Sequence, residues 1–166
     1  MSYTRGVPHE PREPREIERK FLVDIARWRP AGDGVVLRQG YLSSHPERTV
    51  RVRLEGESGK LTIKGLTTGV TRAEYEYAIP AADAAALLAL CERPLIEKVR
   101  HTEQHERKTW EIDVFHGDNE GLVIAELELA SEDEPFAVPP WALEEVSHDP
   151  RYYNANLVKA PYRTWT

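Results

Sequence analysis

The chain has 166 residues, 40% of them hydrophobic, and a formal net charge of −6. This length favours one compact domain with a sizeable core over two full domains. The acidic balance argues against a general nucleic-acid binder, because affinity for a phosphate backbone needs an extended basic surface. The single cysteine, Cys91, rules out an intramolecular disulfide and leaves no thiolate cluster for structural zinc.

Signals for membranes and export are missing from the sequence. No apolar run approaches the roughly 20 residues that span a bilayer, and the first residues lack the apolar core of a signal peptide. A lone cysteine also fits a reducing compartment. We therefore expect a soluble, cytoplasmic protein without a membrane partner.

The first 14 residues contain three prolines and no periodicity, which predicts a flexible arm, so we expect the domain to span residues 15–166. From Arg15 onward, apolar and polar residues alternate with period two, which indicates half-buried strands. Turn residues in 55–59 and 116–119 fit antiparallel hairpins. The predicted strands cover residues 15–23, 34–42, 48–55, 60–66, 70–79, 95–104, 108–115 and 121–130.

Two segments have helical composition. Residues 80–90 are rich in alanine and leucine, with Pro80 at a tolerated early position, and predict a helix packed outside the sheet. Near the C-terminus, Asp149 and Pro150 suit the N-cap and first position of a short terminal helix.

The polar face of the predicted strands is unusually rich in charge. Glu16, Glu18 and Lys20 share one face of their strand because side chains alternate, and Arg51 and Arg53 share a face of another. A solvated sheet face with loosely paired charges is one explanation. The sorting of acidic and basic residues by strand instead favours a charged lumen, since a closed ring of about eight strands leaves room for one small ligand. Other charges on these faces are Lys64, Glu74, Glu76, Lys98, Arg100, Glu111, Asp113, Glu126 and Glu128.

A lumen with so many buried charges would be costly without a charged ligand. Carboxylate oxygens suit a divalent cation such as Mg²⁺, which bridges to phosphate oxygens. Arginines make bidentate contacts to phosphate, and lysines act as point charges along a phosphate chain. The residue types therefore point to a phosphate polyanion bound together with metal.

The stretch Glu16-Ile17-Glu18-Arg19-Lys20 resembles the Glu-x-Glu-x-Lys signature of the CYTH family, also called triphosphate tunnel metalloenzymes. The resemblance covers residues 15 to about 160. Seven further stretches match in the family's order: Gln39-Gly40-Tyr41-Leu42, Thr49-Val50-Arg51-Val52-Arg53, Thr62-Ile63-Lys64-Gly65, Glu74-Tyr75-Glu76-Tyr77, Ile96-Glu97-Lys98-Val99-Arg100, Trp110-Glu111-Ile112-Asp113 and Ala125-Glu126-Leu127-Glu128.

The resemblance implies a mainly β fold, a closed eight-stranded antiparallel β-barrel tunnel with a charged lumen and helices packed outside. By position, Mg²⁺, or Mn²⁺ in its place, would be held by Glu16, Glu18, Glu126 and Glu128, which with Lys20 form the expected catalytic set. The substrate would be held by Lys20, Arg51, Arg53, Lys64, Lys98 and Arg100. Glu76 and Asp113 are expected to bind a second metal, to orient the attacking water, or to form structural ion pairs.

Among the family's reactions, the short chain most resembles bacterial triphosphatases that cleave the terminal phosphoanhydride of inorganic triphosphate. Thiamine triphosphatase and class IV-type adenylate cyclase are the enzymatic alternatives, and a non-catalytic polyphosphate or nucleotide binder is the alternative of another class. Arg151 and Lys159 in the tail are secondary candidates for substrate contact, and the Tyr41 hydroxyl either reaches the lumen or packs. A homodimer is left open, and no nucleic-acid partner is expected.

Overall fold

The computed structural model describes residues 15–165, so the predicted arm over residues 1–14 lies outside the described part. The described chain forms one antiparallel sheet with a few short helices. Its strands are β1 (Arg15–Val23), β2 (Val35–His45), β3 (Arg48–Glu55), β4 (Ser58–Gly65), β5 (Thr71–Pro80), β6 (Ile96–His105), β7 (Lys108–Phe115), β8 (Val123–Glu128) and β9 (Ala142–Glu145).

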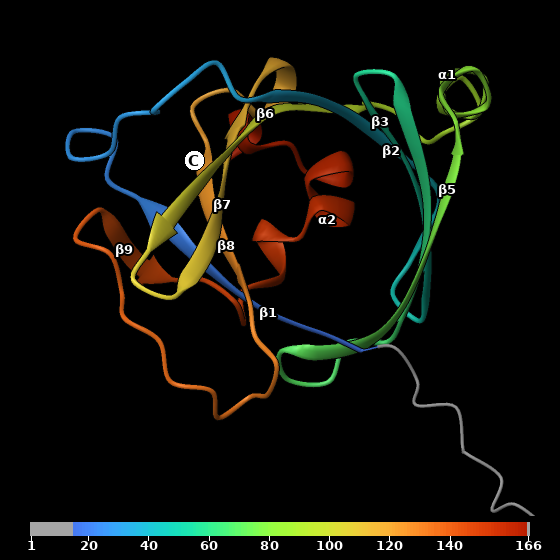
Figure 1. The fold of residues 1–166 in the computed structure, drawn as a ribbon. Coiled ribbons are helices and arrows are strands. Elements are labelled where there is room, and N and C mark those ends of the chain that lie inside the picture. The colour runs from blue at the N-terminus through green and yellow to red at the C-terminus, as the bar shows by residue number, and fades with distance from the viewer. Residues whose placement is uncertain (1–14, 166) are drawn as a thin grey trace, which may run out of the picture.

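Eight of these strands close into a ring in the order β5-β4-β3-β2-β6-β7-β8-β1 (Figure 1). The ring closes at β1, whose first residues, Arg15 to Ile17, pair with β5 while Glu18 to Leu22 pair with β8. The short strand β9 adds to β1 outside the ring, where Glu145 lies opposite Phe21. The expected eight-stranded antiparallel ring is confirmed.

Each predicted strand corresponds to an observed one, with bounds that differ by a few residues. The turns also follow the sequence, since Gly56 between β3 and β4 has a φ of 56°, which glycine adopts without a steric cost. Strand β9 was not predicted. Its four residues, Ala142 to Glu145, are too few to establish a period-two pattern.

The apolar faces of the strands point away from the lumen and form two cores outside the ring. One core joins β1, β7 and β8 through Phe21, Trp110 and Leu127, and two separate segments that carry Trp28 and Trp141 pack against it. Helix α1 (Ala81–Leu88) covers the second core on the outer face of β3 and β4. These contacts confirm the expected arrangement of an apolar outside and a charged inside, with α1 packed outside.

The C-terminal helix α2 (Asn154–Lys159) differs from the expectation that all helices pack outside. Leu157 and Val158 of α2 pack in one cluster with Ile96 and Ile124, which lie on the same strand faces as the lumen residues Lys98 and Glu126. The helix is therefore inserted at one end of the ring, where Figure 1 shows it inside the outline of the strands. The inner face turns apolar at that end, which local alternation alone does not reveal.

Three short 3-10 helices complete the described chain: η1 (Gly117–Asn119), η2 (Pro150–Tyr152) and η3 (Tyr162–Thr164). Asp149 caps η2 as expected, since its side chain accepts a hydrogen bond from the Arg151 amide and Pro150 follows it. Among residues 15–165, no helix is long and apolar enough to cross a membrane.

Candidate active site

A cavity of about 940 Å³ lies inside the ring. Nine lysine and arginine side chains line it, against seven glutamates. The cavity is therefore net positive, although the whole chain carries a net charge of −6. A positive cavity within an acidic protein selects for an anionic ligand.

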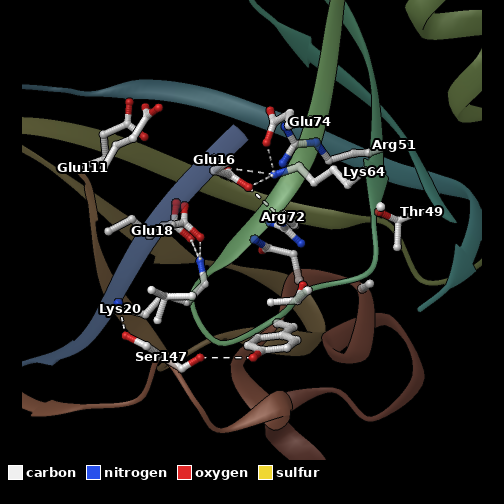
Figure 2. A pocket seen from close by; sticks show the side chains of 18 of the residues that line it. Glu16, Glu18, Lys20, Thr49, Arg51, Lys64, Arg72, Glu74, Glu111 and Ser147 are labelled. Atoms are coloured by element: carbon white, nitrogen blue, oxygen red, sulfur yellow. Dashed lines mark hydrogen bonds and ion pairs between the residues drawn. The ribbon is translucent and has the colours of Figure 1, made fainter. Parts of the chain in front are cut away.

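Strands β1 and β8 place carboxylates side by side on the cavity wall. Glu18 lies opposite Glu128 in the register, and Lys20 lies opposite Glu126. Lys20 Nζ is 2.5 Å from both Glu18 Oε2 and Glu126 Oε1 (Figure 2). Burial and the nearby charge of Glu126 raise the pKa of Glu18. For Glu126 itself, burial is outweighed by Lys20, Lys98 and Arg100, which hold its pKa well below the ordinary value.

Glu16 lies at the start of β1 and contacts one cation of β4 and one of β5. Its Oε2 is 2.8 Å from Lys64 Nζ and 2.7 Å from Arg72 Nε (Figure 2). Burial alone would raise the pKa of Glu16, but the charges of Lys64 and Arg72 outweigh burial and hold it well below the ordinary value. Lys64 also lies 2.7 Å from Glu74.

Strand β3 supplies two buried arginines to the cavity. Arg51 Nη2 donates to Thr62 Oγ1 at 3.2 Å, and Arg53 Nη2 lies 3.5 Å from Glu76 Oε2. Within residues 15–165, the Nε atoms of Arg51 and Arg53 have no hydrogen-bond partner. Two buried guanidinium groups with unsatisfied donors suit an anion with several acceptor oxygens.

Lys98 and Asp113 lie on the inward faces of β6 and β7 but do not line the cavity. Both are almost fully buried, and the Lys98 ammonium contacts the Asp113 carboxylate. Arg100 does line the cavity, and it bridges Asp113 and Glu126 with Nη2 contacts of 2.6 Å each. Burial lowers the pKa of Lys98. In this arrangement the Lys98 ammonium is linked to the cavity through Asp113 and Arg100, and its charge also acts on Glu126.

Glu76 of β5 contacts cations of β3 and β4. Its Oε1 is 2.8 Å from Lys60 Nζ, and its Oε2 lies 3.7 Å from Arg51. Burial of Glu76 acts to raise its pKa, but the hydrogen bond from Lys60 and the charge of Arg53 outweigh burial and lower it. Both Glu76 and Asp113 therefore lie in ion pairs, and only Glu76 lines the cavity.

The donor set on β1 and β8 fits a divalent cation. Glu128 makes no ion pair within residues 15–165. Desolvation and the carboxylates of Glu16 and Glu111 raise its pKa, which reflects an excess of negative charge at this corner of the cavity. In the same part of the chain, no three His, Cys, Asp or Glu side chains already converge on one point. The Lys20 ammonium lies between Glu18 and Glu126 and neutralises both.

Several cavity residues were not among the sequence candidates. Arg72, Lys60 and Ser147 all line the cavity. Arg72 could have been found from alternation, because it shares a strand face with Glu76. No local pattern marks Ser147, which follows β9 and lies beside β1 only through the tertiary fold.

The tail contributes uncharged groups to one end of the cavity, among them Tyr153, Asn154 and Asn156. The two charged tail candidates do not line it. Arg151 pairs with Asp149 at 2.6 Å on the surface, and Lys159 Nζ donates to the Ser44 carbonyl at 3.4 Å. The Tyr41 side chain is buried at the cavity wall and packs in the cluster that holds α2.

Comparisons with known proteins agree with this geometry. The CYTH domain matches residues 14–159. An inorganic triphosphatase of Acetivibrio thermocellus is 49% identical over 152 residues, which cover 91% of this chain and 97% of that protein. An inorganic triphosphatase of Nitrosomonas europaea is 38% identical, with coverage of 86% and 95%. A crystal structure of an inorganic triphosphatase superposes with a TM-score of 0.61 at 37% identity, covering 86% of this chain and 93% of that one.

Proposed function

The chain belongs to the CYTH domain family, and from that membership we propose that it is a metal-dependent hydrolase that cleaves the terminal phosphoanhydride of inorganic triphosphate. The observation that carries this proposal is the net positive charge of the cavity. Buried arginines of β3 line it together with the carboxylates of β1 and β8. Such a cavity suits a linear phosphate polyanion together with a cation.

Mg²⁺ is the cofactor we propose, with Mn²⁺ as its substitute. Its ligands would come from Glu16, Glu18, Glu126 and Glu128, whose hard oxygen donors match the preference of these ions. The bound cation supplies charge neutralisation to the phosphate oxygens. The raised pKa values of Glu18 and Glu128 support this assignment, because a nearby cation would favour their ionised forms.

Arg51 and Arg53 bind the phosphate chain in this proposal, using Nε donors that have no hydrogen-bond partner among residues 15–165. Lys20, Lys64 and Arg100 add positive charge along the same cavity, and Lys98 supports Arg100 through Asp113. Their positive charge stabilises the negative charge that develops on the oxygens around the terminal phosphorus.

Water attacks the terminal phosphorus in line with the leaving diphosphate, and a carboxylate of the cavity orients the water. Glu111 suits this role best because it remains partly exposed to the cavity and is not one of the proposed metal ligands. Glu76 and Asp113 serve as structural partners of Arg51, Arg53 and Arg100 in this scheme. No nucleophilic side chain is needed.

A substrate panel tests the proposal. Phosphate release is measured with inorganic triphosphate, ATP, GTP, thiamine triphosphate and pyrophosphate at equal concentration in the presence of Mg²⁺. We expect the highest kcat/KM for inorganic triphosphate. Faster turnover of thiamine triphosphate, or formation of cyclic AMP from ATP, would replace the proposal with the corresponding alternative. Binding of triphosphate without any turnover would instead make the protein a non-catalytic binder.

Two further assignments are also proposals. The single cysteine fits a reducing compartment, so we place the protein in the cytoplasm. A homodimer would use the outer face of β4 and β5, where Ile63, Tyr75 and Tyr77 are exposed. Light scattering of the purified protein gives the mass that distinguishes one copy from two.

A further inference from the structure

One edge of β1 pairs first with β5 and then with β9, and Lys20 lies between these two pairings. Before it, Glu18 N donates to Val70 O at 3.2 Å, next to β5, and after it Phe21 pairs with β9. At this gap between two strand partners, the Lys20 amide donates to the Ser147 hydroxyl at 2.9 Å (Figure 2). The Lys20 carbonyl accepts from the Val146 amide at 2.8 Å. A side-chain hydroxyl therefore takes the place of one strand hydrogen bond.

The Ser147 hydroxyl is itself oriented by an ion pair outside the ring. Ser147 Oγ donates to Glu145 Oε1 at 2.6 Å. The same carboxylate accepts two hydrogen bonds from Arg19, each 2.5 Å long. Because Arg19 precedes Lys20 in β1, its side chain points away from the lumen. The ion pair between Arg19 and Glu145 on the outside of the ring is thus connected to the Lys20 backbone through the buried Ser147.

The position of this backbone matters for the charges in the cavity. The Lys20 ammonium holds Glu18 and Glu126 together at 2.5 Å each. A change in the Lys20 backbone would move the ammonium group relative to both carboxylates. The Ser147 carbonyl also accepts from the Tyr153 hydroxyl at 3.1 Å, so the segment that leads into α2 is anchored at the same residue.

We propose that Ser147 and Glu145 are positioning residues for Lys20, and this inference rests on the triphosphatase function proposed above. Ser147 satisfies the Lys20 amide, and Glu145 keeps the serine hydroxyl turned toward it. Neither residue takes part in the chemistry. Their removal weakens the binding of inorganic triphosphate because Lys20 loses its fixed place between Glu18 and Glu126.

The kinetic test compares Ser147→Ala and Glu145→Gln with Glu97→Gln. Glu97 pairs with Arg38 at 3.1 Å on the outside of the ring and does not line the cavity, so its variant controls for the loss of a surface ion pair. We expect KM for inorganic triphosphate to rise about tenfold in Ser147→Ala, the size of one buried hydrogen bond. Glu145→Gln should raise KM about threefold, because the hydroxyl remains but loses its fixed orientation. The kcat should stay within about threefold in both, since the reacting groups are retained.

A wild-type KM in Ser147→Ala would overturn the inference. So would an equal fall in kcat in all three variants that follows their melting temperatures, because that pattern indicates only lost stability.

A second measurement keeps this inference separate from the proposed function. Hydrogen exchange of the Lys20 amide, followed by NMR, should be about tenfold faster in Ser147→Ala than in the wild type, while other β1 amides change less. If the wild-type protein releases no phosphate from triphosphate, the proposed function fails, yet this comparison still tests the positioning. An unchanged Lys20 exchange rate in both variants would contradict it.

Discussion

Lys20 and Glu126 face each other across β1 and β8, with Nζ 2.5 Å from Oε1 and both side chains buried. Each charge has a second partner, since Lys20 also contacts Glu18 and Glu126 also contacts Arg100. A buried charge that loses its partner is strongly destabilised. Removal of either charge should therefore affect both catalysis and the order of the cavity wall.

Glu126→Gln should abolish metal-dependent turnover while triphosphate binding falls only modestly. The amide is close in shape but lacks the negative charge that a divalent cation needs. We expect kcat to fall by at least about a hundredfold, measured as phosphate release with saturating Mg²⁺. Glu97→Gln is the control, because Glu97 faces outward from β6. Wild-type turnover in Glu126→Gln would refute the assignment of this carboxylate.

Arg53→Ala should weaken triphosphate binding directly. The Arg53 guanidinium is buried at the cavity wall, and we expect the loss of its contact with phosphate to raise Kd by about ten- to hundredfold. Calorimetric titration with inorganic triphosphate measures this change without relying on turnover. Arg38→Ala is the matched control, because Arg38 belongs to neighbouring β2 but is half exposed and faces outward. Equal affinities for the two variants would show that Arg53 does not hold substrate.

Gly40→Ala should destabilise the packing of β2 against the segment after α1. An added Cβ would lie 2.6 Å from Cys91 Cβ and 2.7 Å from Leu95 Cδ2, so one of these groups must move. We expect a loss of about 1–3 kcal/mol in the free energy of unfolding, measured by urea titration. In the control variant Gly65→Ala, the nearest atom is Ala73 Cβ at 3.6 Å, an ordinary contact. The same unfolding midpoint for both variants would be inconsistent with close packing at Gly40.

The ion pair between Arg19 and Glu145 should make stability depend on acid pH. The hydrogen bonds from Arg19 lower the pKa of Glu145 in the folded protein. A carboxyl with a lowered folded-state pKa stabilises the fold above its unfolded-state pKa, and this contribution is lost as the pH falls through the folded-state value. The difference in unfolding free energy between wild type and Glu145→Gln should thus be larger at pH 7 than at pH 3. A difference independent of pH would speak against the ion pair.

Much of the fold could be predicted because its information is local. Period-two alternation in Arg51 to Arg53, for example, identifies both a strand and the face that points inward. The closure between β1 and β5 joins residues more than 50 positions apart, such as Glu16 and Arg72, and alternation within one strand says nothing about that pairing. The contact between Arg72 and Glu16 was not predicted for this reason.

The candidate site was harder to predict because the tertiary fold decides which of the inward-facing side chains line the cavity. Lys98 and Arg100 share one face of β6, yet only Arg100 lines the cavity, while Lys98 is buried in an ion pair with Asp113. The insertion of α2 at one end of the ring decides which inward residues remain accessible. Neither the spacing nor the residue type of Lys98 distinguishes it from Arg100.

The most direct test of the central claim is phosphate release from inorganic triphosphate by the purified wild-type protein, with Mg²⁺ and after its removal by a chelator. The carboxylates of β1 and β8 and the arginines of β3 are proposed to act together, so we expect release with Mg²⁺ and almost none without it. Restoration of activity when Mg²⁺ is added back would exclude irreversible damage by the chelator. Equal release under both conditions, or no release with either Mg²⁺ or Mn²⁺ present, would contradict a metal-dependent triphosphatase.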